Sequence, residues 1–386
     1  MYIPNFLALN EELKMLDRLV RKWVSEELIP LEQEVEDRDE IWPELMDKLL
    51  KKSRELGLWA LTVPAEYGGS GIGKLGLCVA ASAIGRTSAA FWLFVDGGRP
   101  YLDLNFATPY QLEKFFLPQI RGEKFQCFAL TEPDAGSDTT AIKTYAVKEG
   151  NLWKINGFKH FITYGDIADY AAVVARTDKE RDVREGTTIF LVEKGTPGFT
   201  VVEIQRKMGH RGEHQAAFAF DDCCVPEENV YGKPNQGYRL ALAGLDYTRL
   251  KYSAFHLGQI ERMLELSVDY AKCRITFGKP IAERQAIQWM LADMALDLFI
   301  GKFMVYSAAK ENDESLGDPI KGSMAKLYVS EAVCRAADKA VQIFGGMGLM
   351  KDVPVERFYR DSRFFRIIEG PSEIHKMVIA RALLRD

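Results

Sequence analysis

One carboxylate near the end of the chain follows a run of apolar residues. Glu369 comes after Phe364, Phe365, Ile367 and Ile368, and Gly370 follows it. Burial among apolar side chains raises the pKa of a carboxyl above its ordinary value of about 4.3. A glutamate with a raised pKa can accept a proton from a weak carbon acid near neutral pH. We interpret Glu369 as a candidate general base, the alternative being a solvated glutamate at a loop edge.

A second carboxylate, Asp96, follows the aromatic and apolar residues 91–95 and precedes Gly97 and Gly98. Two interpretations stay open at this point. Asp96 is either a second acid or base, or an aspartate at a helix end that pairs with Arg99 or another cation.

Four further segments carry residues suited to one bound cofactor. Residues 130–138 combine hydroxyls, a proline turn and a glycine, and their backbone N–H groups can face a flat ring or a phosphate. In residues 155–163 we interpret Asn156-Gly157 as a hairpin turn, with aromatic residues before Thr163. Arg274 is suited to bidentate phosphate contact, and consecutive glycines at 345 and 346 permit close backbone approach. For each segment, the alternative is plain structure: a turn, a hairpin, a solvated arginine and a helix stop.

The elements that must position these residues change in type along the chain. Apolar residues at three-and-four spacing predict a helix within 11–29, which Pro30 interrupts. A second helix over about 43–56 is expected to end at Gly57, and helical patterning continues with interruptions over about 74–121.

The middle of the chain predicts strands joined by short turns. The sequence at 149–151 indicates a hairpin, and the remaining strands are expected at residues 171–175, 187–192, 199–204 and 216–220. Such spacing is typical of an antiparallel sheet or barrel. A helical period returns from about 237, and the apolar face within 284–311 is expected to be core, with part of it at a subunit contact. The sequence therefore predicts an α+β protein divided into residues 1–125, 126–236 and 237–386.

Composition excludes several classes of protein. The 386 residues are 47% hydrophobic and 27% charged with a net charge of −5, which disfavours a nucleic-acid partner. No stretch reaches the roughly 20 apolar residues that cross a bilayer, and the N-terminus resembles neither a signal nor a transit peptide. Six scattered cysteines favour reduced thiols in the cytoplasm, and the five histidines show no metal-ligand grouping.

The order and spacing of the motifs resemble the acyl-CoA dehydrogenase family over nearly the full chain. The resemblance rests on runs that include Leu56-Gly57-Leu58, TEPDAGSD at 131–138, INGFKHFIT at 155–163, Lys207 to Arg211, Arg274-x-x-Phe277-Gly278, Gln342 to Gly346 and Ile368-Glu369-Gly370. It implies an N-terminal helical domain, a middle β domain and a C-terminal four-helix bundle. It also implies FAD as the cofactor, a homotetramer, and an electron-transfer flavoprotein or another electron acceptor.

The resemblance also implies roles for individual residues. The segment from Phe128 to Ser137 and the residues Phe161 to Thr163 are expected to embrace the flavin ring, with Leu130, Thr131 and Gly136 in the first segment. The adenosine pyrophosphate is expected to contact Arg274, Phe277, Gln285, Gln342, Gly345 and Gly346, partly across a subunit interface. The CoA portion of the substrate is expected to contact Ser137, Asp246 and Arg249. Glu369 is expected to take the α-proton while the β-hydrogen leaves as hydride to flavin N5.

Several positions depart from the family pattern. Phe161, Tyr164 and Leu349 replace commoner residues, and Pro371 removes a hydroxyl and a backbone donor, so that Ser372 is expected to take over a flavin contact. Asp96 lies in the part of the chain that helps line the acyl pocket in the family, where the matching position is usually not acidic. A cyclic or otherwise unusual acyl-CoA is compatible with it. The alternatives are an oxidase or reductase of the same fold, a DNA-associated flavoprotein of the family, and a catalytically silent scaffold.

Overall fold

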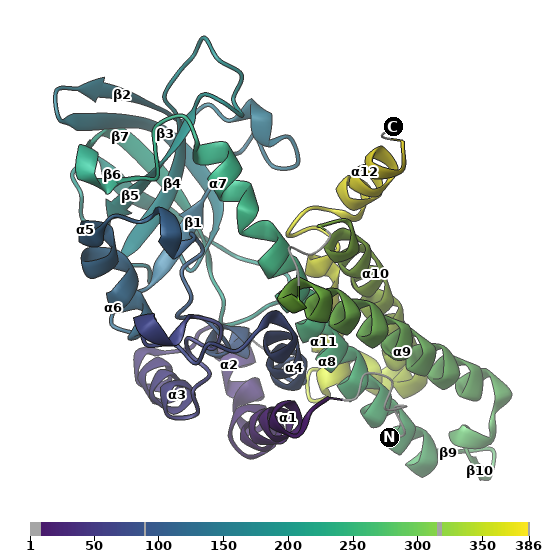
Figure 1. The fold of residues 1–386 in the computed structure, drawn as a ribbon. Helices are drawn as coiled ribbons and strands as arrows, with labels where there is room; N and C mark the ends of the chain where they lie inside the picture. Colours follow the sequence, from purple (N-terminus) through teal and green to yellow (C-terminus); the bar gives the residue numbers. More distant parts are fainter. Residues whose placement is uncertain (1–8, 89, 315–318, 385–386) are drawn as a thin grey trace.

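The computed structural model describes residues 9–88, 90–314 and 319–384. Its N-terminal part is helical (Figure 1), with α1 Glu11–Trp23, α2 Glu32–Arg38, α3 Pro43–Glu55, α4 Lys74–Ile84, α5 Pro109–Gln111 and α6 Leu117–Ile120. Between them lie π-helical turns at Val24–Leu28 and Leu112–Phe116 and 3₁₀ turns at Ile29–Leu31, Ala65–Tyr67, Ala90–Phe94 and Leu104–Phe106.

The helices predicted at 11–29 and 43–56 are present. The three-and-four spacing places Leu16, Val20 and Trp23 on the buried side of α1. Gly57 has a φ of 70° and its N–H donates to the carbonyl of Arg54 at 3.0 Å, which is the left-handed helix end expected there. The sequence missed α2, a short helix of mostly charged residues.

The middle part of the chain forms one large sheet. Its strands are β1 Gln126–Ala129, β2 Tyr145–Glu149, β3 Leu152–Thr163, β4 Tyr170–Arg176, β5 Thr187–Glu193, β6 Phe199–Gln205, β7 Gln215–Pro226 and β8 Val230–Tyr231, with 3₁₀ turns at Thr139–Ala141 and Glu227–Asn229. The order is β6-β7-β3-β2-β4-β5-β8, and β1 pairs with β4. Most neighbours run antiparallel as expected, but β1 and β2 run parallel to β4. The hairpin predicted at 149–151 joins β2 to β3.

The hairpin turn predicted at Asn156-Gly157 is wrong. Both residues lie inside the long strand β3, which pairs with β7 on either side of them. The register between the two strands shifts between Ile155 and Gly157, so the glycine marks a bulge rather than a turn. A Cβ at position 157 would lie 2.4 Å from the Thr144 hydroxyl oxygen, which explains the glycine.

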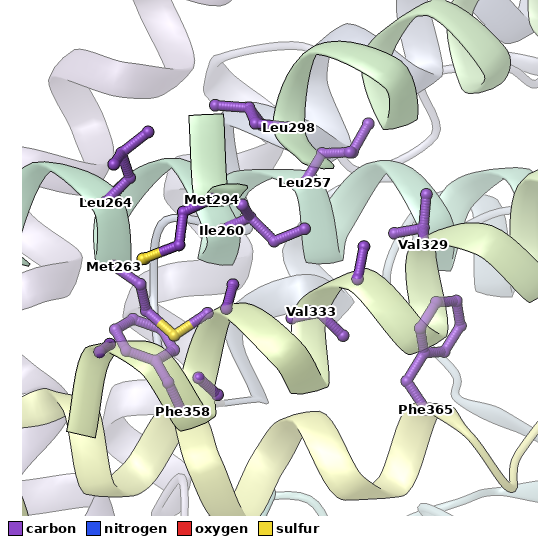
Figure 2. Close-up of a cluster of buried hydrophobic side chains, with 14 of the residues drawn as sticks. Leu257, Ile260, Met263, Leu264, Met294, Leu298, Val329, Val333, Phe358 and Phe365 are labelled. Carbon is purple, nitrogen blue, oxygen red and sulfur yellow. The ribbon is translucent and has the colours of Figure 1, made fainter. Parts of the chain in front are cut away.

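The C-terminal part is a helical bundle preceded by α7. Its elements are α7 Gly237–Ala243, α8 Leu245–Cys273, β9 Ile275–Thr276, β10 Lys279–Pro280, α9 Gln285–Glu314, α10 Pro319–Phe344, α11 Pro354–Phe365 and α12 Ser372–Leu383, with 3₁₀ turns at Ile281–Glu283 and Gly345–Leu349. Figure 2 shows the core that α8, α9, α10 and α11 share, with Leu257 and Ile260 from α8, Leu298 from α9, Val333 from α10 and Phe358 from α11.

Helix α8 also packs on the N-terminal part of the chain. Gly258 of α8 lies against α4, where an added Cβ would come within 2.1 Å of the carbonyl oxygen of Ser82. Arg262 of α8 is paired with the buried Glu32 of α2. The middle of α8 is therefore held between the N-terminal helices and the bundle. Within the described residues, no helix is both long enough and apolar enough to span a bilayer.

Candidate active site

Glu369 lies on the loop between α11 and α12, and its side chain is partly buried. Its φ of 56° and the φ of 91° at Gly370 turn the backbone sharply at this point. The carboxylate accepts a hydrogen bond from the Thr248 hydroxyl of α8 at 2.6 Å. Burial raises the pKa of Glu369, while the Thr248 hydrogen bond and the nearby Arg249 and Lys326 partly offset that rise.

Lys326 of α10 holds the Glu369 loop in place. Its fully buried ammonium donates to the carbonyls of Phe365 at 2.6 Å and Gly370 at 2.8 Å. Burial lowers the pKa of Lys326 to about 7, and the charge of Glu369 counteracts part of that fall. The loop is thus fixed from α10 at its base, while its carboxylate is fixed from α8.

The groups around Glu369 leave one backbone donor available. Among the described residues, no hydrogen bond is found from the backbone N–H of Glu369. Tyr101 lies near enough that the charge of Glu369 adds to the burial that raises the pKa of its phenol. The ring of Tyr101 stacks on Phe128 of β1, with the ring centres 4.0 Å apart. Phe128, one of the expected flavin-ring residues, is thereby brought into the neighbourhood of Glu369.

The ends of β1 and β3, where most of the expected flavin-ring residues lie, are fastened together by a buried ion pair. Lys159 of β3 donates to the Glu132 carboxylate at 2.8 Å and to the Leu130 carbonyl at 2.9 Å. The N–H of His160 donates to the Thr131 carbonyl at 2.9 Å. The structure therefore brings Leu130 and Thr131 beside the strand that ends at Thr163.

The remaining residues of this group lie at the surface. Phe161 has a φ of 57° and is 59% exposed, and Gly136 and Ser137 are exposed as well. The Thr163 hydroxyl donates to the Gln215 amide oxygen at 3.1 Å. These residues fit a flavin ring: Phe161 offers an exposed aromatic ring, Ser137 and Thr163 offer hydroxyls, and a Cβ added at Gly136 would meet nothing within 4 Å.

The residues expected to contact the adenosine pyrophosphate gather at another place. The β9–β10 hairpin and the start of α9 carry Arg274, Phe277 and Gln285, and the end of α10 carries Gln342, Gly345 and Gly346. Close to both, the ring of Tyr270 in the last turn of α8 stacks on the ring of Phe344 at the end of α10, with the ring centres 4.2 Å apart. All six expected residues are exposed, Phe277 by 98%. Figure 1 shows this end of the bundle far from the sheet, so one chain does not bring the two groups together.

The other expected contacts are partly described. Ser372 is buried and its hydroxyl donates to Glu331 at 2.7 Å, so its flavin contact stays a prediction. Arg249 follows Thr248 on α8 and acts electrostatically on Glu369. The Asp246 side chain lies outside the described part of the structure, so its CoA contact also stays a prediction.

Asp96 is buried at 3% exposure, with a φ of 61°. Its carboxylate accepts from the N–H and the hydroxyl of Thr62, at 2.9 and 2.6 Å, and from the hydroxyl of Tyr247. The expected pairing with Arg99 takes a different form, because the Arg99 guanidinium lies 3.8 Å above the centre of the Tyr247 ring. Asp96 is thus tied to the residue that directly precedes Thr248, the partner of Glu369.

The sequence pattern did not single out Thr248 and Lys326, which contact Glu369 and its loop from a partly buried and a buried helix position. A lysine in a helix is most often a surface residue, so its type carries no signal of burial. One signal was available at Lys326: it interrupts a stretch of α10 that is otherwise rich in alanine and valine.

The fold and the site define a helical–β–helical protein with a partly buried carboxylate and surfaces suited to a flavin. Three family models match the chain: "Acyl-CoA dehydrogenase, N-terminal domain" at residues 10–123, the middle domain at 127–223 and the C-terminal domain at 235–384. The chain therefore belongs to the acyl-CoA dehydrogenase family. Members of this family are FAD-dependent oxidoreductases, and solved structures similar to this chain include an FAD complex.

Individual relatives cover nearly the whole chain. An acryloyl-CoA reductase (NADH) of Anaerotignum propionicum is 38% identical over 382 residues, which are 98% of this chain and 96% of that protein. An acyl-CoA dehydrogenase of Bacillus subtilis is 38% identical over 383 residues, 98% of this chain and 99% of that protein. The solved butyryl-CoA dehydrogenase from Megasphaera elsdenii is 34% identical with a TM-score of 0.91, covering 98% of this chain and 99% of its own.

Proposed function

We propose that this chain is an acyl-CoA dehydrogenase in which Glu369 removes the α-proton of an acyl-CoA thioester. The observation that carries the proposal is the Glu369 carboxylate, partly buried, positioned by Thr248 at 2.6 Å and raised in pKa by burial. A thioester carbonyl acidifies the adjacent C–H, and a base whose pKa approaches the working pH removes such a proton most effectively. Bound FAD supplies the acceptor for the β-hydride.

The chain also supplies a donor for the thioester carbonyl. The backbone N–H of Glu369 has no partner among the described residues, and the loop that carries it is fixed by Lys326. We assign this N–H to the carbonyl oxygen, where charge develops as the proton leaves. A preorganised donor at that position typically contributes about 3–4 kcal/mol to the transition state.

Replacement of the base tests the proposal. We expect Glu369→Gln to slow anaerobic bleaching of the flavin by an acyl-CoA by about 10²–10⁴-fold, because general base catalysis contributes that much. The matched control is Glu373→Gln, an exposed glutamate four residues later in the first turn of α12. For this comparison, the Glu369→Gln protein must contain as much bound FAD per chain as the wild type. Bleaching at the wild-type rate in Glu369→Gln would refute the proposal.

The direction of the reaction and the electron acceptor form a separate part of the proposal. We propose dehydrogenation with transfer of electrons to an electron-transfer flavoprotein. The alternatives are a reductase, the activity in the name of one relative, and an oxidase. Stopped-flow rates distinguish them: acyl-CoA reducing the flavin, enoyl-CoA reoxidising the reduced flavin, and oxygen reoxidising it. Faster reoxidation by enoyl-CoA than reduction by acyl-CoA would favour the reductase.

We propose that the chain works as a homotetramer. The two groups of expected FAD residues lie at separate places in one chain, so a single FAD needs residues from two copies to contact both. Exposed apolar residues on α9 and the β9–β10 hairpin support an interface there, with Phe277 98%, Trp289 61% and Leu296 57% exposed. We expect light scattering to give the mass of four chains and Trp289→Glu to lower both that mass and the FAD content. An FAD-loaded monomer would contradict this proposal.

The remaining parts of the proposal concern class and location. A net charge of −5 argues against the DNA-associated alternative, which a gel-shift assay at moderate salt tests. We propose a cytoplasmic location with reduced cysteines, and the domain division 1–125, 126–236 and 237–386. A proton-transfer role for Asp96 on a cyclic or unusual acyl group stays a prediction. It requires that Asp96→Asn lower turnover without lowering FAD content.

A further inference from the structure

A group of polar side chains, of which Asp96 and Lys251 are buried, lies beside the first turns of α8. It consists of Thr62, Asp96, Arg99, Tyr247 and Lys251, and we call it the Asp96 cluster. Among the described residues, the Asp96 carboxylate accepts hydrogen bonds from Thr62 and Tyr247, which both belong to the cluster. These contacts fix the carboxylate and the tyrosine in one arrangement.

Lys251 is the member of the cluster for which the described part of the chain offers no hydrogen-bond partner. Its side chain is only 5% exposed. Its ammonium lies 4.8 Å from the centre of the Trp92 ring and makes no hydrogen bond with any residue that the structure describes. A lysine with so little exposure ordinarily directs its ammonium at hydrogen-bond acceptors, because removing the charge from water without them is unfavourable. The missing acceptors point to a ligand that supplies them.

The charges in the cluster indicate the sign of that ligand. Asp96 and Arg99 are the charged groups that act on Lys251. Burial lowers the pKa of Lys251 to about 8, and Asp96 offsets only part of that change. Two cations and one carboxylate leave one positive charge uncompensated, so the complementary ligand group is a single anion.

The position of Lys251 on α8 connects it to the proposed reaction. Tyr247 binds Asp96, and the next residue, Thr248, binds Glu369. Lys251 follows Thr248 by three positions and Tyr247 by four, so the three side chains share one face of the helix. Along the helix axis Lys251 lies only about 4.5 Å from Thr248. Trp92 provides a second connection between Lys251 and Glu369. Its ring packs on the ring of Tyr252, and the charge of Glu369 contributes to the raised pKa of Tyr252.

We propose that Lys251 and the Asp96 cluster select an acyl-CoA whose chain carries a carboxylate at its far end. The thioester end lies at Glu369 and the far carboxylate accepts from the Lys251 ammonium, while Asp96 holds Tyr247 beside it. This inference rests on the proposed function for its substrate class. A lysine with a purely packing role over Trp92 would give no preference between charged and neutral acyl chains.

The wild-type enzyme gives the first test. The probes are dicarboxylic acyl-CoA thioesters of four to seven carbons, each paired with the monocarboxylic acyl-CoA of equal carbon number. We expect at least one dicarboxylic thioester to bleach the flavin with a higher kcat/KM than its partner. A preference for the monocarboxylic thioester at every length overturns the proposal.

Variants then assign the preference to Lys251. We expect Lys251→Met to lower the ratio of kcat/KM values, dicarboxylic over monocarboxylic, by about 10- to 100-fold, since a hydrogen bond between charged groups is lost. Lys48→Met, which removes an exposed charge from α3, is the matched control and keeps the wild-type ratio. Lys251→Gln is the second variant if Lys251→Met fails to retain FAD. An unchanged ratio in a folded, FAD-loaded Lys251 variant overturns the proposal.

A binding measurement separates this inference from the proposed reaction. Anaerobic calorimetric titration with the same pairs gives the ratio of Kd values without turnover. If no thioester bleaches the flavin but Lys251→Met still removes the preference in binding, the proposed reaction fails and the recognition of the carboxylate stands. If the flavin is bleached while the dicarboxylic and monocarboxylic thioesters bind equally well, the reaction stands and this inference fails.

Discussion

The buried ion pair between Lys159 and Glu132 joins two segments that carry expected flavin-ring residues, so its loss should lower both the stability of the protein and the retention of FAD. Lys159 is fully buried and Glu132 is 5% exposed, with 2.8 Å between their charged groups. Glu132 also accepts from the backbone N–H groups of Lys143 at 2.6 Å and Thr144 at 3.0 Å. The perturbation is Lys159→Met, which keeps an unbranched side chain of similar length and removes the ammonium.

The contacts determine the size of the effect. Lys159→Met leaves the Glu132 carboxylate buried with two backbone donors and removes the donor to the Leu130 carbonyl. Removal of one partner of a buried pair costs about 3–5 kcal/mol. For a cooperative unit of 150–250 residues, each kcal/mol lowers Tm by about 2–4 °C, so we expect a fall of about 6–20 °C. In Lys159→Met/Glu132→Gln the unpaired charge is gone, and the two costs should fall short of additivity by about 1–3 kcal/mol.

The assay is differential scanning calorimetry of the holoenzyme, with FAD content measured by absorbance after gel filtration. The matched control is Lys143→Met, which breaks a pair with Asp134 whose side chains are 74% and 70% exposed. Such an exposed pair contributes at most about 1 kcal/mol. We expect Lys159→Met to release FAD at a lower temperature than Lys143→Met does. Two results would refute this prediction: equal Tm values for Lys159→Met and Lys143→Met, or losses of stability in Lys159→Met and Glu132→Gln that add up to the loss in the double variant.

Three further predictions concern the proposed base Glu369, its support by Lys326 and the helix α8. The pKa of Glu369 is raised in the folded state, so the ionised carboxylate destabilises the fold once the pH rises above that pKa. Glu369→Gln should therefore raise Tm above that of the wild type, and by more at pH 8 than at pH 5. An equal rise in Tm at the two pH values would contradict this prediction. Lys326→Met removes two hydrogen bonds to the Glu369 loop and a positive charge near Glu369. It should destabilise the protein by about 1–3 kcal/mol and shift the acidic limb of the kcat/KM profile to higher pH. An acidic limb at the wild-type pH would show that Lys326 does not act on the pKa of Glu369. Gly258→Ala places a Cβ 2.1 Å from the Ser82 carbonyl oxygen and should lower the free energy of unfolding, measured with a chemical denaturant, by about 1–3 kcal/mol or more. The control is Gly322→Ala on α10, where an added Cβ meets nothing within 4 Å, and it should not lower the free energy of unfolding.

The parts of the structure that the sequence predicts well depend on local rules. The end of α3 follows from the left-handed preference of Gly57, and the β2–β3 hairpin follows from the turn residues at 149–151. Glu369 could be singled out because its neighbours in the sequence are apolar, and it is partly buried in the fold, although the adjacent Ile367 is 57% exposed. In each of these cases the residues that decide the outcome lie within about five positions of one another.

The failures depend on partners distant in the sequence. Asn156-Gly157 satisfies the local rule for a turn, but pairing with β7 draws both residues into one long strand and turns the glycine into a bulge. Lys251 and Lys326 are indistinguishable from surface lysines until α8 and α10 are packed. One of the two interpretations of Asp96 paired it with a cation such as Arg99, three residues away, yet its partners are Thr62 and Tyr247, which are 34 and 151 positions distant.

Helix α8 gives the site a single geometric reference. Its second and third residues after the start of the helix, Tyr247 and Thr248, each hold one carboxylate, Asp96 and Glu369 respectively. A shift of α8 along its axis would therefore displace the proposed base and the proposed acyl-recognition group together. The close approach at Gly258 restricts such a shift, because backbone atoms of α4 and α8 are already in contact there. This crossing lies ten residues from Thr248, about 15 Å along the helix at a rise of roughly 1.5 Å per residue. A substitution there should thus impair turnover and acyl preference in parallel, which would not happen if the two carboxylates were supported independently.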